Sequence, residues 1–347
     1  MPREDEFQAF DQPGASSGET EPARPFAHAE MVACDVCLRA NPPTRMNCLY
    51  CGATLPATEQ SAALRRPTLK KLEEWERGFN VVLLPRGGAS PKPDAVEEAA
   101  SLLRLEASRL SEIIASGRSL PLARASSTEE AGLVVSRLGV LGLDTEVFTD
   151  EVLTRAPERA RAFEFEEGAL VCWQGPDAAP RRVLFDEIAL LVEGRIVERR
   201  VEVEERKTRF GGRSEVVGAR ELASDELVLD IYAAGEGAAF RVMSGGFDYS
   251  CLGADKGLLA AENFRKLTGA LRGLAKSATY DGEYTRLRPL LADVWPSAEH
   301  TASLGLVGAG GGRVKTGAVT TVSNEAQFTR YARLLQGLAK RAHAESS

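Results

Sequence analysis

The spacing of hydrophobic residues predicts a compact α/β unit over residues 79–150 with the element order β-α-α-β-α-β. Its strands are predicted over 79–84, 120–125 and 143–148. Two helices with apolar stripes follow the first strand, and a third helix follows the second strand. Because proline cannot donate to a strand ladder, Pro121 indicates that the second strand lies at a sheet edge or only begins there.

Capping signals mark the starts of two of these helices. Asp94 is followed three residues later by Glu97, and Ser127 is followed by Glu130 at the same spacing. In a capping box the first side chain accepts from the later backbone N–H, and the later side chain reaches back to the cap. We therefore expect capping boxes at both places.

After residue 160 the pattern changes to short runs with a period of two, which is typical of antiparallel strands. The runs are 169–173, 183–191, 195–205, 227–232, 240–243 and 247–252. A helix follows with four apolar residues on one stripe, namely Phe264, Leu267, Leu271 and Leu274. The pattern predicts a β-barrel-like domain with a C-terminal helix over residues 160–278.

Residues 279–347 are predicted as a helical C-terminal extension. One helix ends near Trp295, where Pro296 stops it, and a short β stretch follows over 319–322. Asn324 and Gln327 have capping-box spacing at the start of a final helix. This helix is interpreted as docked on the β-rich domain, with a dimer or partner face as the alternative.

The N-terminal part has little apolar periodicity. Residues 1–30 carry seven acidic residues and are predicted to be a disordered acidic tail. Residues 57–78 alternate in charge and are predicted to be a linker helix. Trp75 is expected to dock this helix on a neighbouring element, or alternatively to be exposed and to contact a partner. The fold class predicted for the whole chain is therefore multidomain α+β.

Composition narrows the class of protein. The chain has 347 residues, 44 % of them hydrophobic and 27 % charged, and a formal net charge of −7. That charge argues against a general grip on nucleic acid, which needs clustered Lys and Arg. No apolar run approaches the roughly 18 residues that a membrane span needs. A cytoplasmic location without a membrane span is the expectation.

Two Cys-x-x-Cys pairs carry the clearest chemistry. Cys34 and Cys37 are separated by ten residues from Cys48 and Cys51, a spacing that brings four thiolates to one metal ion. Gly52 suits the tight turn after the second pair. The alternative of two disulfides would require export. We therefore predict a zinc finger or ribbon over residues 31–56, with one structural Zn²⁺ because four thiolates leave no open position.

Two further cysteines stand apart from this motif. Cys172 and Cys251 lie in apolar, strand-like surroundings and have no pairing signature. Free Cys is among the most buried residue types. Both are expected to be buried free thiols, with a disulfide or redox role as the alternative.

The cysteine motif resembles the zinc finger of the Ran-binding-protein type over residues 31–54, and equally a prokaryotic zinc ribbon. The resemblance includes Asn41 and Arg45 and implies, in some members, single-stranded RNA binding. Val32 stands where those members have a base-stacking tryptophan, and stacking contributes about 1–3 kcal/mol per base. Leu38 and Arg39 stand where other members have a ubiquitin-binding Thr-Phe pair. Candidate ligand contacts are Asn41, Arg39 and Arg45.

Two larger segments also resemble known folds. Residues 79–149 resemble the C-terminal domain of the bacterial ribosomal stalk protein, which implies protein binding, although the helices here are acidic where that family is basic. Residues 160–278 resemble the pleckstrin-homology superfold, which implies lipid-headgroup or peptide binding. The basic loop between Arg206 and Arg220 is a candidate anion site there, or a solvated loop.

The sequence shows no catalytic motif. The glycine-rich run 305–316 resembles a phosphate-binding loop, but a dinucleotide-binding motif needs glycine where Arg313 stands, and a Walker loop needs glycine where Val314 stands. The run also leads into a β run, so it offers no helix N-terminus to a phosphate. The predicted function is a non-enzymatic, zinc-binding cytoplasmic adaptor whose partner is a protein. The alternatives are a single-stranded RNA-binding protein that uses the finger and an enzyme with an unrecognised site.

Overall fold

The computed structural model describes residues 26–27, 30–56, 61, 64–65, 67, 69–73, 76–85, 91–175, 177–208, 215–234, 238–308 and 313–346. For 204–208, 215–217, 304–308, 313–316 and 343–346 it describes the backbone only. The described residues leave out 1–25 and 28–29 of the predicted tail over 1–30, Trp75, and Arg209 and Arg213 of the basic loop. The fold is mixed α+β, and the chain forms two compact units, Met1–Arg66 and Pro67–Ser347.

The second unit begins with the predicted β-α-α-β-α-β order, which is confirmed. Its elements are β3 (Phe79–Leu83), α2 (Pro93–Leu103), α3 (Ala107–Ala115), β4 (Leu120–Ala125), α4 (Thr128–Val140) and β5 (Thr145–Thr149). The strands form an antiparallel sheet in the order β4-β3-β5. β4 is an edge strand, as Pro121 predicts. The register of its pairing with β3 shifts between Val81 and Val82 of β3.

One predicted helix cap is confirmed and one is wrong. The Ser127 hydroxyl accepts the N–H of Glu130 at 3.2 Å. The Asp94 cap is wrong, because α2 begins earlier at Pro93, whose missing N–H suits the first helical position. The Glu130 carboxylate does not return to its own cap residue's N–H. It accepts the N–H groups of Ser126 and of Leu69 instead.

That bond to Leu69 explains why part of the predicted linker helix does not form. Residues 69–73 have no helical structure, and Leu69 has a φ of 37°. The Leu69 side chain is buried in the core, and its N–H lies 2.9 Å from the carboxylate of Glu130. A tertiary anchor therefore overrides the local helical pattern.

The β-rich region forms a curled half-barrel closed by a helix. A three-stranded antiparallel sheet comprises β7 (Ala162–Glu166), β8 (Ala169–Trp173) and β9 (Arg181–Leu184). The short elements beside it are α5 (Asp150–Leu153), β6 (Glu158–Arg159), η2 (Phe185–Glu187) and η3 (Tyr249–Asp255). The long β10 (Ile188–Thr208) and β11 (Glu215–Ala233) pair with each other, and β11 pairs with β12 (Ala239–Met243). Helix α6 (Ala260–Leu274) buries Phe264, Leu267 and Leu271 in a core shared with these strands, but Leu274 of the predicted stripe is exposed.

The C-terminal segment differs from a helical extension, because three of its elements are strands of the main sheet. It comprises β13 (Thr279–Asp281), α7 (Tyr284–Leu291), β14 (Ala298–Gly308), β15 (Arg313–Ser323) and α8 (Glu325–Ser346). β13 and β15 both pair with β10, and the strand order is β14-β15-β10-β11-β12-β6. The predicted stretch 319–322 lies within β15. The described parts of the glycine-rich run 305–316 are the end of β14 (305–308) and the start of β15 (313–316).

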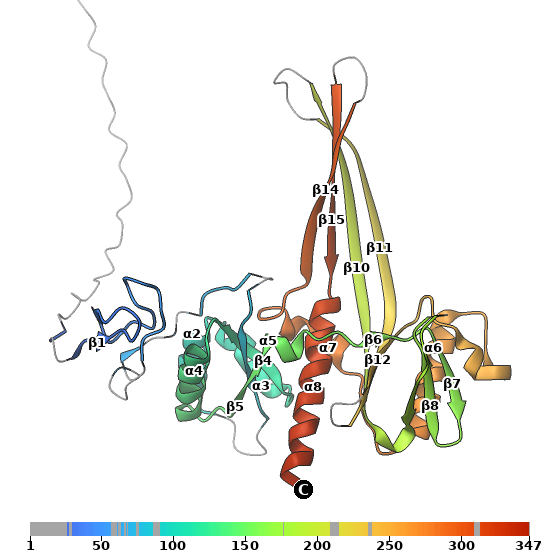
Figure 1. The fold of residues 1–347 in the computed structure, drawn as a ribbon, viewed down its shortest axis with the longest axis horizontal. Helices are drawn as coiled ribbons and strands as arrows, with labels where there is room; N and C mark the ends of the chain where they lie inside the picture. Colours follow the sequence, from blue (N-terminus) through green and yellow to red (C-terminus); the bar gives the residue numbers. More distant parts are fainter. Residues whose placement is uncertain are drawn as a thin grey trace, which may run out of the picture. The chain divides into compact units, whose positions relative to one another are not determined.

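Four of these strands lie side by side as a long twisted ribbon (Figure 1). The β-ribbon consists of β14, β15, β10 from Glu198 to Thr208, and β11 from Glu215 to Ser224. Its central pair, β10 with β15, continues without a shift from Glu198 opposite Ser323 to Thr208 opposite Arg313.

A shared core joins the α/β elements to α7 and α8. Trp295, just after α7, is fully buried, and its indole N–H donates to Asn80 of β3 at 2.8 Å. Asn80 in turn donates to the Asp150 carboxylate at 3.0 Å. The amide of Gln327 in α8 donates to the backbone carbonyl of Trp295. The predicted capping pair at α8 therefore acts across elements, since the Asn324 amide also bonds the backbone of β10.

Candidate metal centre

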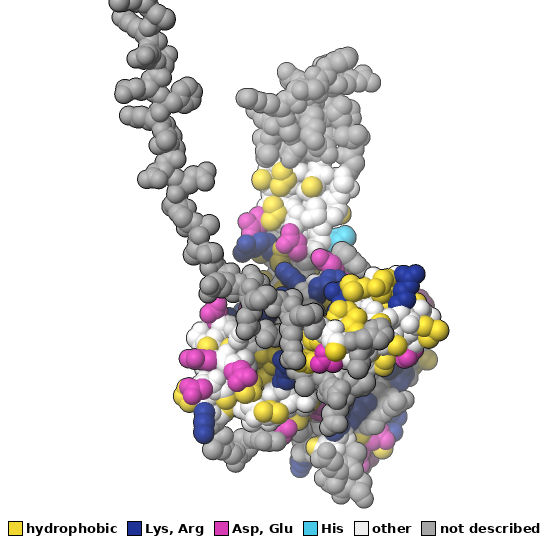
Figure 2. Space-filling view, turned by 90° about the vertical axis from the view of Figure 1, so that its left-hand side faces the viewer, with side chains coloured by type: hydrophobic (Ala, Val, Ile, Leu, Met, Phe, Trp, Pro, Cys, Tyr) yellow, Lys and Arg dark blue, Asp and Glu magenta, His cyan; other side chains and the backbone are white. Residues whose placement is uncertain are grey.

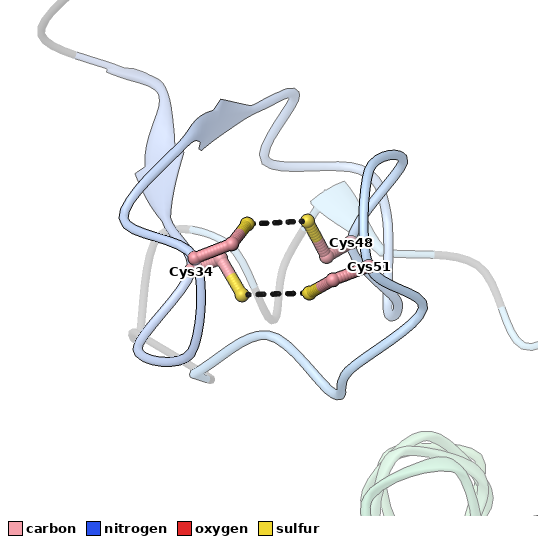
Figure 3. Close-up of side chains that lie close together, drawn as sticks. Cys34, Cys48 and Cys51 are labelled. Carbon is pink, nitrogen blue, oxygen red and sulfur yellow. Dashed lines mark hydrogen bonds between the residues drawn. The ribbon is translucent and has the colours of Figure 1, made fainter.

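The four cysteines of the first unit converge, as their spacing predicts. β1 (Val32–Ala33) leads into the first Cys-x-x-Cys turn, and β2 (Ala40–Asn41) returns antiparallel to it. All four sulfur atoms lie within 4.8 Å of one another. The Sγ atoms of Cys34 and Cys51 are 3.6 Å apart, and those of Cys37 and Cys48 are 3.5 Å apart (Figure 3). These are free thiols, far beyond the roughly 2.05 Å of a disulfide bond.

The two turns are built alike. The N–H of Leu38 donates to the carbonyl of Cys34 at 2.8 Å, and the N–H of Gly52 donates to the carbonyl of Cys48 at 3.0 Å. Both donors have positive φ, 59° at Leu38 and 75° at Gly52. Gly52 adopts this conformation without a Cβ penalty, whereas Leu38 does so in spite of one. The turns therefore hold each cysteine pair in a fixed, mutually facing arrangement.

Hydrogen bonds to sulfur favour the thiolate at one position. The Asn41 amide and the N–H of Tyr50 each donate to Cys48 Sγ at 3.4 Å. Burial acts to raise the pKa of the Cys48 thiol, but these bonds and others lower it to about 6. These hydrogen bonds therefore favour the thiolate form of Cys48.

The pKa of the Cys51 thiol shifts in the opposite direction. The N–H of Ala53 acts to lower the pKa of that thiol, but burial and the three neighbouring sulfurs outweigh it and raise the pKa to about 12. Crowded sulfurs resist complete ionisation, because each new thiolate repels the others. A bound cation removes that repulsion and deprotonates a coordinating thiol outright. The donor set thus fits a metal ion.

The three predicted ligand contacts have different surroundings. Asn41 is fully buried, and its amide bonds within the module: besides Cys48 Sγ it donates to the Arg39 carbonyl and accepts from the N–H of Leu49. Asn41 therefore positions the cysteines and has no surface for an external ligand. Arg39 and Arg45 are exposed. The Arg39 guanidinium lies 4.7 Å from the ring centroid of Tyr50, an aromatic contact that the motif alone did not reveal.

Exposed apolar side chains surround the metal centre. Val36 and Leu38 in the first turn are 72 % and 80 % exposed, and Leu49 and Tyr50 in the second are 54 % and 57 % exposed. We call these four residues the knuckle face. Among the described residues, the buried hydrophobic core of the module is Val32, Cys34, Cys48 and Leu55. So small a core stabilises the module little by itself, and a bound metal ion would supply most of its folding energy.

The remaining candidates offer less chemistry. Cys172 is fully buried, and burial raises the pKa of its thiol to about 12. Cys251 is partly buried, and burial raises the pKa of its thiol as well. Arg220 of the predicted anion site is exposed on β11, while only the backbone is described at Arg206 and Lys207. In the described parts of the chain, no helix is long and apolar enough to cross a membrane.

Comparison of this chain with protein-family models, with curated proteins and with solved structures gave no match.

Proposed function

We propose that the first unit binds one structural zinc ion through Cys34, Cys37, Cys48 and Cys51, and that the protein is a non-enzymatic cytoplasmic adaptor for protein partners. The observation that carries the proposal is the convergence of four sulfurs within 4.8 Å. A tetrahedral four-sulfur site is typical of zinc or of iron. Zinc fits the structural role, because four thiolates leave no open position for substrate or water.

The adaptor role rests on the knuckle face. A small module that exposes four large apolar side chains presents a surface suited to covering by another protein. The metal then serves to hold that surface in shape, and its binding energy is also the folding energy of the module.

Metal content tests the first half of the proposal. Protein purified without added metal should contain one equivalent of zinc by elemental analysis, and Cys48→Ser should lose most of it. The matched control is Cys172→Ser, which removes a buried thiol of the second unit and should keep the full equivalent. Iron in place of zinc, or a full equivalent in Cys48→Ser, would contradict the proposal.

Partner capture tests the second half. Affinity purification from the native organism should recover a partner with the wild-type chain and lose it with Leu38→Asp, which places a charge in the knuckle face. Thr44→Asp is the control, since Thr44 is exposed within the same module but lies outside that face. Equal recovery with both variants would remove the knuckle face from the interface.

A second candidate function is single-stranded RNA binding, favoured by the contact of Arg39 with the exposed Tyr50 ring. Aromatic rings and arginine planes are the groups on which bases stack. Under the adaptor proposal, a zinc-loaded peptide of residues 25–60 should bind short single strands no more tightly than about 10⁻⁴ M at physiological salt. Sub-micromolar, salt-sensitive binding that Arg45→Ala abolishes would favour the RNA function instead.

A further inference from the structure

The outer edge of β14 is open. β14 stands at one end of the strand order and pairs with β15 from Ala298 to Gly308, with one register shift between Ser303 and Gly305, and no other described strand pairs with it. Alternate backbone N–H and C=O groups of an edge strand point away from the sheet and can pair with another strand. An open edge of this length is therefore either protected by its sequence or used for pairing.

The opposite edge of the β-ribbon is protected. β12 covers β11 only over Val228–Tyr232, so the outer side of β11 over 218–227 has no described strand beside it. That stretch carries four charged residues, listed here: Arg220, Glu221, Asp225 and Glu226. Charged side chains on an edge are a common means by which proteins prevent strand addition.

The β14 edge has no such protection. From His300 to Gly308 its sequence contains no Asp, Glu, Lys, Arg or Pro. Figure 2 views the ribbon from the side on which β14 lies in Figure 1, and the described surface above its base is formed by hydrophobic and uncharged polar groups. The contrast between the two edges of one sheet indicates that the β14 edge is kept free for a partner strand.

The sequence of β14 also suits one particular occupant, its own copy. A strand can lie antiparallel to the same strand of a second chain about a two-fold axis, which gives a self-complementary interface. Like charges directly opposite each other destabilise such a pair. With the axis at Ala302, Thr301 faces Ser303. The single charged residue, Glu299, lies opposite the uncharged stretch beyond the register shift at Leu304 of the second copy, so no two charges meet. The small side chains near the axis also let the backbones approach.

We propose that β14 pairs antiparallel with β14 of a second copy of this chain, with the two-fold axis at Ala302, so that the two β-ribbons form one continuous sheet. Each chain then supplies the same open edge, and the charged β11 edges become the outer borders of the joined sheet. The interface is closed, because the two β14 edges pair with each other about one two-fold axis and present no further copy of the contact to a third chain.

Charge placed at the axis tests the proposal. Ala302 is exposed, so a longer side chain there has room in the single chain. Sedimentation equilibrium at up to about 100 µM should show a wild-type dimer. Ala302→Lys and Ala302→Glu should each raise the dimer dissociation constant about tenfold or more, because like charges meet at the axis. An equimolar mixture of the two variants should restore a dimer, since opposite charges then meet.

Three controls make the result decisive. Ala223→Lys adds the same charge at an exposed position of the β11 edge and should leave the dimer intact. Circular dichroism and the melting temperature should show that each variant is folded. Cys48→Ser should also leave the dimer intact, which separates this proposal from the zinc site. A monomeric wild type, a dimer that persists in Ala302→Lys, a mixture that does not restore it, or dissociation by Ala223→Lys would each overturn the proposal.

Discussion

Replacing Trp295 with phenylalanine should destabilise the second unit by about 2–4 kcal/mol. The indole is fully buried and donates to Asn80 Oδ1 at 2.8 Å. Leaving a buried acceptor without its donor costs about 1–3 kcal/mol. The smaller ring also gives up buried apolar area, which adds about 1 kcal/mol at roughly 25 cal/mol per Å².

Urea denaturation followed by circular dichroism measures this loss, since the variant removes a fluorescent residue but not the secondary-structure signal. Trp173→Phe is the matched control, because Trp173 is only half-buried in β8 and should lose less than about 1 kcal/mol. A loss below about 0.5 kcal/mol for Trp295→Phe, the range of surface substitutions, would refute the inference that this side chain joins the α/β elements to α7 and α8.

The same contact bears on the expectation that residues 79–150 form a domain of their own. Trp295, Tyr284 and Phe328 belong to the same buried cluster as Val81 and Leu138. A fragment of 79–150 alone would leave its side of this cluster in water. We therefore expect the fragment to be less stable than the same segment within the intact chain.

Three further predictions concern the second unit. Leu138→Ala should cost about 2–5 kcal/mol in urea denaturation because Leu138 is fully buried, whereas Val140→Ala on the same helix, 86 % exposed, should change stability by less than about 0.5 kcal/mol; similar losses would place the wrong face in the core. Gly194→Ala should lower the free energy of unfolding by about 1–3 kcal/mol, because its Cβ would lie 2.5 Å from an aromatic carbon of α8. Gly269→Ala, which has open space around it in α6, should raise that free energy by about 0.5–1 kcal/mol. Stabilisation by both substitutions would reject the close approach at Gly194. Cys172 should resist alkylation at pH 8 in the folded chain and react in urea. Burial raises the pKa of its thiol from the ordinary value of about 9 to about 12, so the unfolded chain loses this proton at lower pH than the folded chain does. This thiol should therefore lower the free energy of unfolding only as the pH rises from about 9 toward 12.

Local signals were strong enough to predict two parts of this chain. The cysteine spacing specifies which sulfurs meet, because two short turns can face each other in few ways. The β-α-α-β-α-β order follows from apolar stripes and from the Ser127 cap, which act within a few residues. Even here the Asp94 cap was wrong, since Pro93 competes for the same helix start.

Long-range structure could not be predicted in the same way. Trp295 and Asn80 are 215 residues apart, and neither residue signals the other. β14 and β15 are rich in Gly, Thr, Ala and Ser, so their pattern lacks the apolar alternation that marks a half-buried strand. Asn324 and Gln327 have the spacing of a helix cap, but the sequence does not reveal that their amides bond β10 and the chain near Trp295.

The uninterrupted pairing of β10 with β15 makes the β-ribbon adjustable in length. Ten steps separate Glu198 from Thr208, which at about 3.3 Å per residue gives a reach of roughly 33 Å. Because side chains alternate between the two faces, removing two residues from each of the four strands would preserve every facing relation and shorten the reach by about 7 Å. Removing one residue would invert the faces. Insertions and deletions in this part of the gene should therefore be tolerated in even steps, and the ribbon could serve as a spacer whose span changes without any change in the core that carries it.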